Sequence, residues 1–165
     1  MWRLSATLLI FGYGNPSRGD DALGPQLLDL LAAQLSSHPE WPEIELLTDF
    51  QLQIEHAADL VNRELVLFID ASVSCPAPCR LSRLHPAQDA RYTTHTMSPE
   101  AVLHVFERVY RQPAPPAFLL SVRGEGFELG EPLSRTAVES RDAALELLIQ
   151  LCARPHPDAW QNYSQ

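Results

Sequence analysis

The sequence predicts an α/β protein: a single three-layer α/β/α domain around a twisted, mostly parallel sheet of about five strands. Strand-like and helix-like segments alternate along the whole chain, and this alternation favours a parallel sheet covered by helices on both faces. The strand-like segments are continuous apolar runs, as is typical of strands that are buried on both faces. The length of 165 residues suits one domain with one core. We expect the domain to span residues 1–154, followed by a polar, loosely held tail at residues 155–165.

Local patterns place the individual elements. Apolar runs predict strands at residues 6–11, 44–48, 65–70 and 118–122, with a short additional strand at 80–84. Leucines recur at helical spacing from Leu27 to Leu35, and residues 52–61 also carry apolar side chains on one helical face. Ser98, which precedes a proline and a glutamate, is expected to cap a third helix, and Ser134 to cap the last one.

Composition excludes several classes of function. The chain carries 12 basic and 21 acidic residues, a net charge of −9, which repels phosphate backbones and argues against nucleic acid as a partner. No apolar run approaches the roughly 20 residues that a membrane span needs, so we expect no membrane insertion and a cytoplasmic location. We also expect a monomer. Three cysteines give no disulfide framework. Cys75 and Cys79 are three residues apart, which is not the redox spacing, and we interpret them as free thiols without a catalytic part.

Polar residues follow the predicted strands, where ligands bind in parallel sheets. Asp21 lies in a glycine-punctuated loop after the first strand, Asp70 ends the third strand, and His95 precedes a predicted helix cap. Two carboxylates and an imidazole suit a borderline divalent metal such as nickel or zinc, and they leave coordination positions open. Paired carboxylates could instead activate water without a metal.

Each of these residues also has an ordinary structural explanation. The glycine loop could be only a tight turn, and we expect Asp20 or Asp21 to cap the leucine-rich helix. The loop lacks the third glycine of the dinucleotide fingerprint, and the chain has no lysine for a Walker loop. Arg123 and Glu125 either line the same rim or belong to a solvated turn. The remaining histidines are interpreted as surface residues: His38, His56, His85, His104 and His156.

The glycine loop closely resembles the N-terminal signature of the hydrogenase maturation proteases. Residues 12–24 contain the motif elements Gly-Tyr-Gly-Asn-Pro, then Arg-Gly-Asp-Asp, then a glycine. The family usually has a glycine after the paired acids, where this chain has Ala22. The resemblance continues at residues 68–72 and 93–95, and ends with the loop at 124–133 and the last helix, so it covers nearly the whole chain.

This resemblance implies an endopeptidase that removes the C-terminal extension of a [NiFe] hydrogenase large-subunit precursor once nickel has been inserted. Asp21, Asp70 and His95 match the metal-contacting positions of the family and are the expected catalytic residues of an aspartic-type or metal-assisted peptidase. Nickel arrives with the substrate, held by the precursor's cysteine thiolates, so we expect no stoichiometric metal in the resting enzyme. Asp20 matches the acid before the first ligand position and is not assigned to the metal.

Two other functions remain open on the same residues. One is a stand-alone metallohydrolase of a small substrate, which a tightly bound resting metal would favour. The other is a non-catalytic chaperone that holds the tail of the large subunit, which binding without peptide release would favour. An acyl-enzyme route is disfavoured, because no Ser-His-Asp or Cys-His set is evident near these loops.

Overall fold

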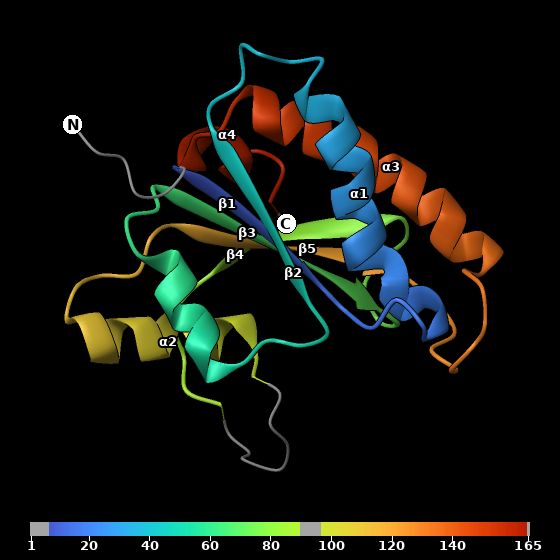
Figure 1. The fold of residues 1–165 in the computed structure, drawn as a ribbon, viewed down its shortest axis with the longest axis horizontal. Helices are drawn as coiled ribbons and strands as arrows, with labels where there is room; N and C mark the ends of the chain where they lie inside the picture. The colour runs from blue at the N-terminus through green and yellow to red at the C-terminus, as the bar shows by residue number, and fades with distance from the viewer. Residues whose placement is uncertain (1–6, 90–96, 165) are drawn as a thin grey trace.

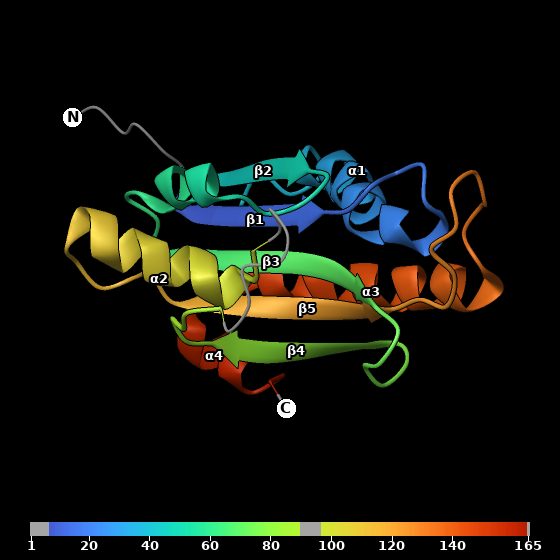
Figure 2. The ribbon, with the colours of Figure 1, turned by 90° about the horizontal axis from the view of Figure 1, so that it is seen from below.

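The computed structural model describes residues 7–89 and 97–164, and within them five strands form one sheet in the order β2-β1-β3-β5-β4. The strands β1 (Leu8–Tyr13), β2 (Ile44–Asp49), β3 (Leu65–Ser72) and β5 (Ala117–Arg123) run parallel, and β4 (Cys79–Leu84) is antiparallel to β5. Figure 2 shows the strands side by side, with the β4 arrow pointing the opposite way. The predicted α/β fold with a mostly parallel sheet of five strands is confirmed.

Helices cover both faces of the sheet (Figure 1). One face carries α1 (Leu23–Leu35) and α3 (Arg135–Ala153), and the other carries α2 (Pro99–Tyr110) and the 3-10 helix η2 (Ile54–Leu60). Serine side chains accept a backbone hydrogen bond at the start of α2 and of α3, as their sequences predict. The resulting three layers leave the carboxyl ends of the parallel strands open at one edge.

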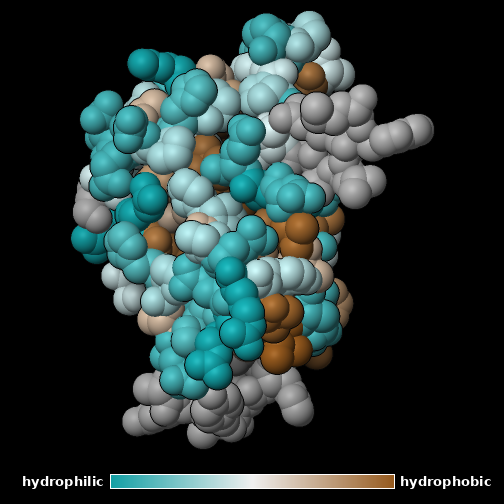
Figure 3. All heavy atoms as spheres, turned by 90° about the vertical axis from the view of Figure 1, so that its left-hand side faces the viewer, coloured by the Kyte–Doolittle hydropathy of each residue, from teal (hydrophilic) through white to brown (hydrophobic). Residues whose placement is uncertain are grey.

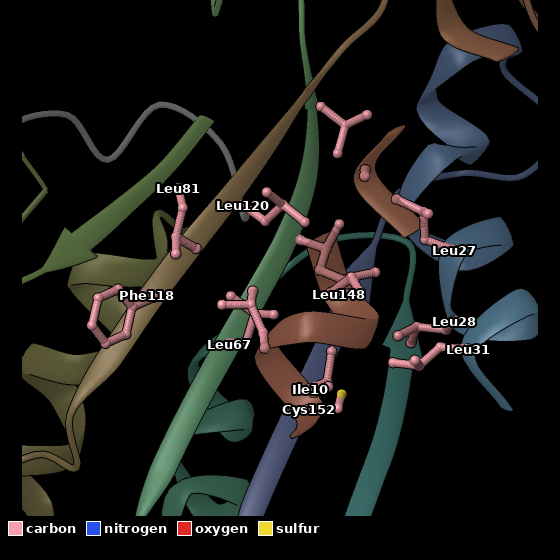
Figure 4. Close-up of a cluster of buried hydrophobic side chains, with 14 of the residues drawn as sticks. Ile10, Leu27, Leu28, Leu31, Leu67, Leu81, Phe118, Leu120, Leu148 and Cys152 are labelled. Atoms are coloured by element: carbon pink, nitrogen blue, oxygen red, sulfur yellow. The ribbon is translucent and has the colours of Figure 1, made fainter. Parts of the chain in front are cut away.

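Side chains alternate along the strands and build one hydrophobic core on each face. In β1, Leu8 and Ile10 belong to the core with α1 and α3, whereas Leu9 and Phe11 belong to the core with α2 and η2. Figure 4 shows side chains of the first core between the strands and the helices. Because burying each large apolar side chain contributes about 1.5–3 kcal/mol, these two cores hold the strands in register.

Two elements differ from their sequence predictions in extent or type. β1 continues through Gly12 and Tyr13, which pair with Thr48 and Asp49 of β2, so part of the glycine motif is strand rather than loop. The segment predicted as a helix at residues 52–61 is a shorter 3-10 helix. A 3-10 helix has three residues per turn, so side chains three positions apart lie on the same side. Here the helix buries His56, Ala57 and Leu60.

The prediction of a loose tail after Pro155 is wrong. Residues there form the helix α4 (Pro157–Gln161), and Trp160 is fully buried. Its indole Nε1 donates a hydrogen bond to the Leu151 carbonyl at 2.9 Å, and its ring lies edge-on to Phe118. A buried tryptophan combines a large apolar area with one hydrogen-bond donor, so this single side chain fixes the segment against the sheet.

The face drawn in Figure 3 is mostly polar, and hydrophobic residues form separate patches on it. Among the exposed apolar side chains, Phe50 and Ile54 are each 62% exposed and follow β2 closely in the chain. In the part of the chain that the structure describes, no helix is long and apolar enough to cross a membrane.

Candidate functional site

The carboxyl ends of β1, β2 and β3 meet at one edge of the sheet and bring together three residues distant in sequence. Tyr13, the last residue of β1, pairs with Asp49, the last residue of β2. On the other side, Gly12 pairs with Ile69 of β3, so the next residue of each strand, Tyr13 and Asp70, lie beside each other. Asp70 therefore lies at the edge where the sequence predicts a site.

Glycines allow the chain after β1 to pack directly on these strand ends. A Cβ atom at Gly14 would lie 2.0 Å from the carbonyl oxygen of Asp21, and the φ angle of Gly14 is +147°. A Cβ atom at Gly24, in the first turn of α1, would lie 2.7 Å from the carbonyl oxygen of Tyr13. Side chains at these positions would push the loop away from the sheet, so the glycine motif brings Asp21 close to the strand ends.

Asp20 is fully buried and connects this loop to the segment between β5 and α3. Its carboxylate accepts hydrogen bonds from the backbone N–H groups of Glu125, Gly126 and Ser134 and from the Ser134 hydroxyl, at 2.7–3.1 Å. Burial alone would raise the pKa of Asp20, but these four hydrogen bonds outweigh it and lower the pKa. Asp20 therefore remains ionised inside the protein.

Neither aspartate caps α1, so that prediction is wrong. The N-cap residue of α1 is Ala22, which makes no side-chain hydrogen bond, because the short 3-10 helix η1 (Gly19–Ala22) leads directly into α1. Asp21 instead accepts a hydrogen bond from the backbone N–H of Asn15 at 2.7 Å. Asp20 thus fixes the loop to the start of α3, and Asp21 fixes the turn after β1.

Asp70 is half-buried and has an unusual titration. Burial raises its pKa, and the negative charge of Asp21 raises it further, whereas hydrogen bonds from the Ala71 backbone and the Tyr13 hydroxyl lower it; the resulting pKa is about 7. Asp21 therefore lies near enough to Asp70 for their charges to interact. A carboxylate with a strongly perturbed pKa beside a second carboxylate is a typical feature of functional sites.

Glu100 is a further carboxylate near Tyr13, and its sequence pattern indicated only the start of a helix. It lies in the first turn of α2. Burial is the main cause that raises the pKa of Tyr13, and the charges of Asp70, Glu100 and Asp21 raise it further. The Tyr13 phenol therefore stays protonated.

An open groove of about 600 Å³ lies beside Asp21. It is formed by the loops that follow β1, β2 and β5, and Arg18 joins two of these loops because its Nε donates to the Phe127 carbonyl at 3.3 Å. Its lining contains side-chain amides, charged groups and two aromatic rings: Asn15, Arg18, Asp21, Asp49, Phe50, Gln51, Gln53 and Phe127.

His56 is buried, so its interpretation as a surface residue is wrong. Its Nδ1 accepts the backbone N–H of Gln53 at 2.8 Å, which leaves Nε2 to donate to Asp49 at 3.1 Å. This histidine holds the carboxylate of Asp49 on the groove wall, and the backbone N–H of Phe50 donates to the same carboxylate at 2.7 Å. The spacing of Gln53 and His56, which forms a capping box, was the available sequence signal.

Other predicted residues have mixed outcomes. Cys75 and Cys79 are free thiols, as predicted. Arg123 lies at the end of β5 and donates to the Cys75 carbonyl at 2.9 Å, while Glu125 accepts a hydrogen bond from Thr136 of α3. His95 lies outside the described residues.

No group of three metal-ligating side chains is found within residues 7–89 and 97–164. Since His95 is not among these residues, its place in the site stays a prediction.

Comparison with known proteins identifies the fold. No family model matches the sequence, and no curated protein matches it. Among solved structures, the [NiFe] hydrogenase maturation protease HycI from Thermococcus kodakarensis KOD1 has a TM-score of 0.68 at 19% identity, covering 92% of this chain and 96% of that one. The chain has the fold of the hydrogenase maturation proteases.

Two further structures agree with this fold. The hydrogenase maturating endopeptidase HybD from E. coli has a TM-score of 0.63 at 25% identity, over 87% of this chain and 91% of that chain. A hydrogenase 2 maturation peptidase from a Thaumarchaeota archaeon has a TM-score of 0.59 at 23% identity, over 87% and 95%. The maturation-protease fold thus covers nearly the full length of each protein.

Replacing Asp20 by asparagine should destabilise this maturation-protease fold. An amide can accept fewer of the four donors and adds donors of its own, so we expect the free energy of unfolding at pH 7 to fall by about 2–4 kcal/mol. The lowered pKa of Asp20 stabilises the fold above its unfolded pKa, and this contribution is lost as pH falls through the folded pKa. Urea unfolding measures the effect, with exposed Asp29→Asn as the matched control; equal midpoints for both variants would contradict the role of Asp20.

Replacing Asp70 by asparagine should have the opposite effect on stability. The pKa of Asp70 is raised on folding, so its contribution to stability is fully present below the unfolded pKa of about 3.9 and is lost as pH rises through about 7. In metal-free buffer at pH 8, Asp70→Asn should therefore increase the free energy of unfolding by about 1–3 kcal/mol, and the gain should vanish near pH 4. A destabilised variant at pH 8 would show that the Asp70 carboxylate is not strained.

Proposed function

We propose that this protein is an endopeptidase that removes the C-terminal extension of a nickel-loaded [NiFe] hydrogenase large-subunit precursor. The observation that carries this proposal is the coupled pair Asp21 and Asp70 beside an open groove, on the fold of maturation proteases. In the proposed site, Asp21, Asp70 and His95 contact nickel that the precursor brings on its own thiolates. Cleavage then depends on nickel delivery, because the site is incomplete without the substrate.

The electrostatics of the two carboxylates support recognition of a metal on the substrate. Asp21 raises the pKa of the half-buried Asp70, so the pair carries unfavourable negative charge when both are ionised. A divalent cation relieves this repulsion, and carboxylate and imidazole ligands suit nickel. The substrate's metal would then polarise the scissile carbonyl or activate water. Alternatively, one carboxylate would act as the general base on water, and the nickel would only position the peptide.

We infer that the groove receives the peptide substrate. Asn15, Gln51 and Gln53 carry side-chain amides at the groove. The Asn15 Oδ1 accepts the Ser17 N–H, and the Gln53 side chain accepts a backbone N–H of η2. The amide N–H groups can donate to the C=O groups of an extended peptide. Phe50 and Phe127 add apolar contact area for side chains. A groove of about 600 Å³ that opens beside Asp21 has room for several residues next to the scissile bond.

Substitution of the three proposed ligands tests the function. We expect Asp21→Asn, Asp70→Asn and His95→Ala each to reduce processing of the nickel-loaded precursor by about 100-fold or more, because each removes a group that contacts the metal. Mass spectrometry of the precursor measures the loss of its C-terminal peptide, and circular dichroism checks folding. The double variant Cys75→Ser/Cys79→Ser is the control and should process normally. Normal processing by any ligand variant would remove that residue from the proposed site.

The metal content of the purified enzyme separates this function from a stand-alone metallohydrolase. Three ligands form an incomplete coordination shell, whereas permanent structural sites are closed by four, so we expect well below one metal per chain after dialysis against a mild chelator. Elemental analysis measures this. About one retained metal per chain, together with hydrolysis of small peptides, would favour the metallohydrolase, and precursor binding without cleavage would favour a chaperone.

A further inference from the structure

The groove beside Asp21 carries charges of both signs, and among the described residues that line it Arg18 is the only cation. The two lining carboxylates already have donors within the protein: Asp21 accepts the backbone N–H of Asn15, and Asp49 accepts from the ring of His56. The whole chain has a net charge of −9. A negatively charged group of a bound peptide is therefore repelled by most of the protein and attracted, within the groove, at Arg18.

The backbone of Arg18 is fixed by contacts on both sides. Its N–H donates to the carbonyl of Asn15 at 3.1 Å, and its carbonyl accepts the N–H of Asp21 at 3.0 Å. The next residue, Gly19, has a φ angle of +54°, and a Cβ atom there would lie 2.6 Å from the carbonyl oxygen of Gly126. This close approach to the segment after β5 holds the base of the Arg18 side chain at the groove wall.

The side chain of Arg18 is exposed, yet one hydrogen bond orients it. Its Nε donates to the carbonyl of Phe127 at 3.3 Å. A guanidinium carries five N–H donors in a planar fork, so this bond leaves the donors of the two terminal nitrogens. Within the described part of the chain these two nitrogens have no acceptor. Three other arginines differ, because a terminal nitrogen of each donates to an acceptor in the protein: Arg63, Arg123 and Arg141.

We propose that Arg18 binds a carboxylate of the precursor's C-terminal extension with its two terminal nitrogens. This inference rests on the proposed function. A carboxylate accepts two parallel hydrogen bonds from the fork of a guanidinium, and a neutral amide or a basic side chain cannot replace it there. The carboxylate belongs either to an acidic side chain of the extension or to its C-terminus. Because Arg18 and Asp21 line one groove of about 600 Å³, the bound carboxylate lies within a few residues of the scissile bond.

Replacing Arg18 by glutamine tests the enzyme's side of this contact. Glutamine removes the charge and the fork, so we expect KM for the nickel-loaded precursor to rise about tenfold or more, which is the effect of losing a charge-assisted hydrogen bond. The value of kcat should change by less than about threefold, because Arg18 contacts the extension and not the reacting atoms.

Arg154→Gln is the matched control. Arg154 is an exposed arginine at the C-terminal end of α3 and does not line the groove, so its replacement removes the same charge and should leave KM normal. Circular dichroism and the urea midpoint verify that both variants fold. A normal KM for Arg18→Gln, or an equal rise in both variants, would overturn the inference.

Changes in the precursor test the same contact with the wild-type chain and identify the source of the carboxylate. In one precursor the acidic side chains of the extension are replaced by their amides, and a second precursor is lengthened by several glycines, which moves its terminal carboxylate. We expect one of the two to raise KM for the wild-type chain by about tenfold, and to cause no further rise for Arg18→Gln, because that variant already lacks the contact. The first precursor would assign the carboxylate to a side chain, and the second to the C-terminus.

The outcomes separate this inference from the proposed function. An unchanged KM for both altered precursors, or a rise that is equal in the wild-type chain and in Arg18→Gln, would overturn the inference alone, because the wild-type chain still cleaves the precursor. A wild-type chain that releases no peptide from the unaltered nickel-loaded precursor would overturn the proposed function, and the inference with it.

Discussion

The buried carboxylate of Asp20 is the interaction on which the geometry of the site depends. It joins the loop after β1 to the segment before α3, whose bonded residues lie 105–114 positions further along the chain. Removing an ionised carboxylate from water is costly, and four hydrogen bonds offset that cost here. Because Asp21 is the next residue, the same bonds determine where its carboxylate stands relative to the sheet.

Close packing at glycines completes this arrangement and lets acidic groups converge. Gly14 and Gly24 allow the start of α1 to touch the ends of the central strands, so Asp21 comes near Asp70. The carboxylates of Asp21 and Asp70 repel each other, and the two hydrophobic cores supply the stability that tolerates this repulsion. Such strain is consistent with a site that a cation completes, as the proposed function requires.

Much of this could be predicted from the sequence, and the failures have physical reasons. Apolar runs predicted the parallel strands because buried strands need no polar alternation, and strand ends pointed to Asp21 and Asp70. The structural role of Asp20 was missed because its partners are distant in sequence. The burial of His56 was missed because residues 52–61 were expected to follow an α-helical period, whereas the segment forms a 3-10 helix. The burial of Trp160 was missed because it lies in a polar segment, where one side chain facing inward leaves no periodic pattern.

The dependence of cleavage on nickel is the most direct test of the account. The precursor of a [NiFe] hydrogenase large subunit, prepared with and without nickel, would be incubated with the wild-type chain and its mass followed over time. The account predicts that only the nickel-loaded precursor loses its C-terminal peptide. Equal cleavage of both forms, or cleavage of neither by a folded enzyme, would contradict it.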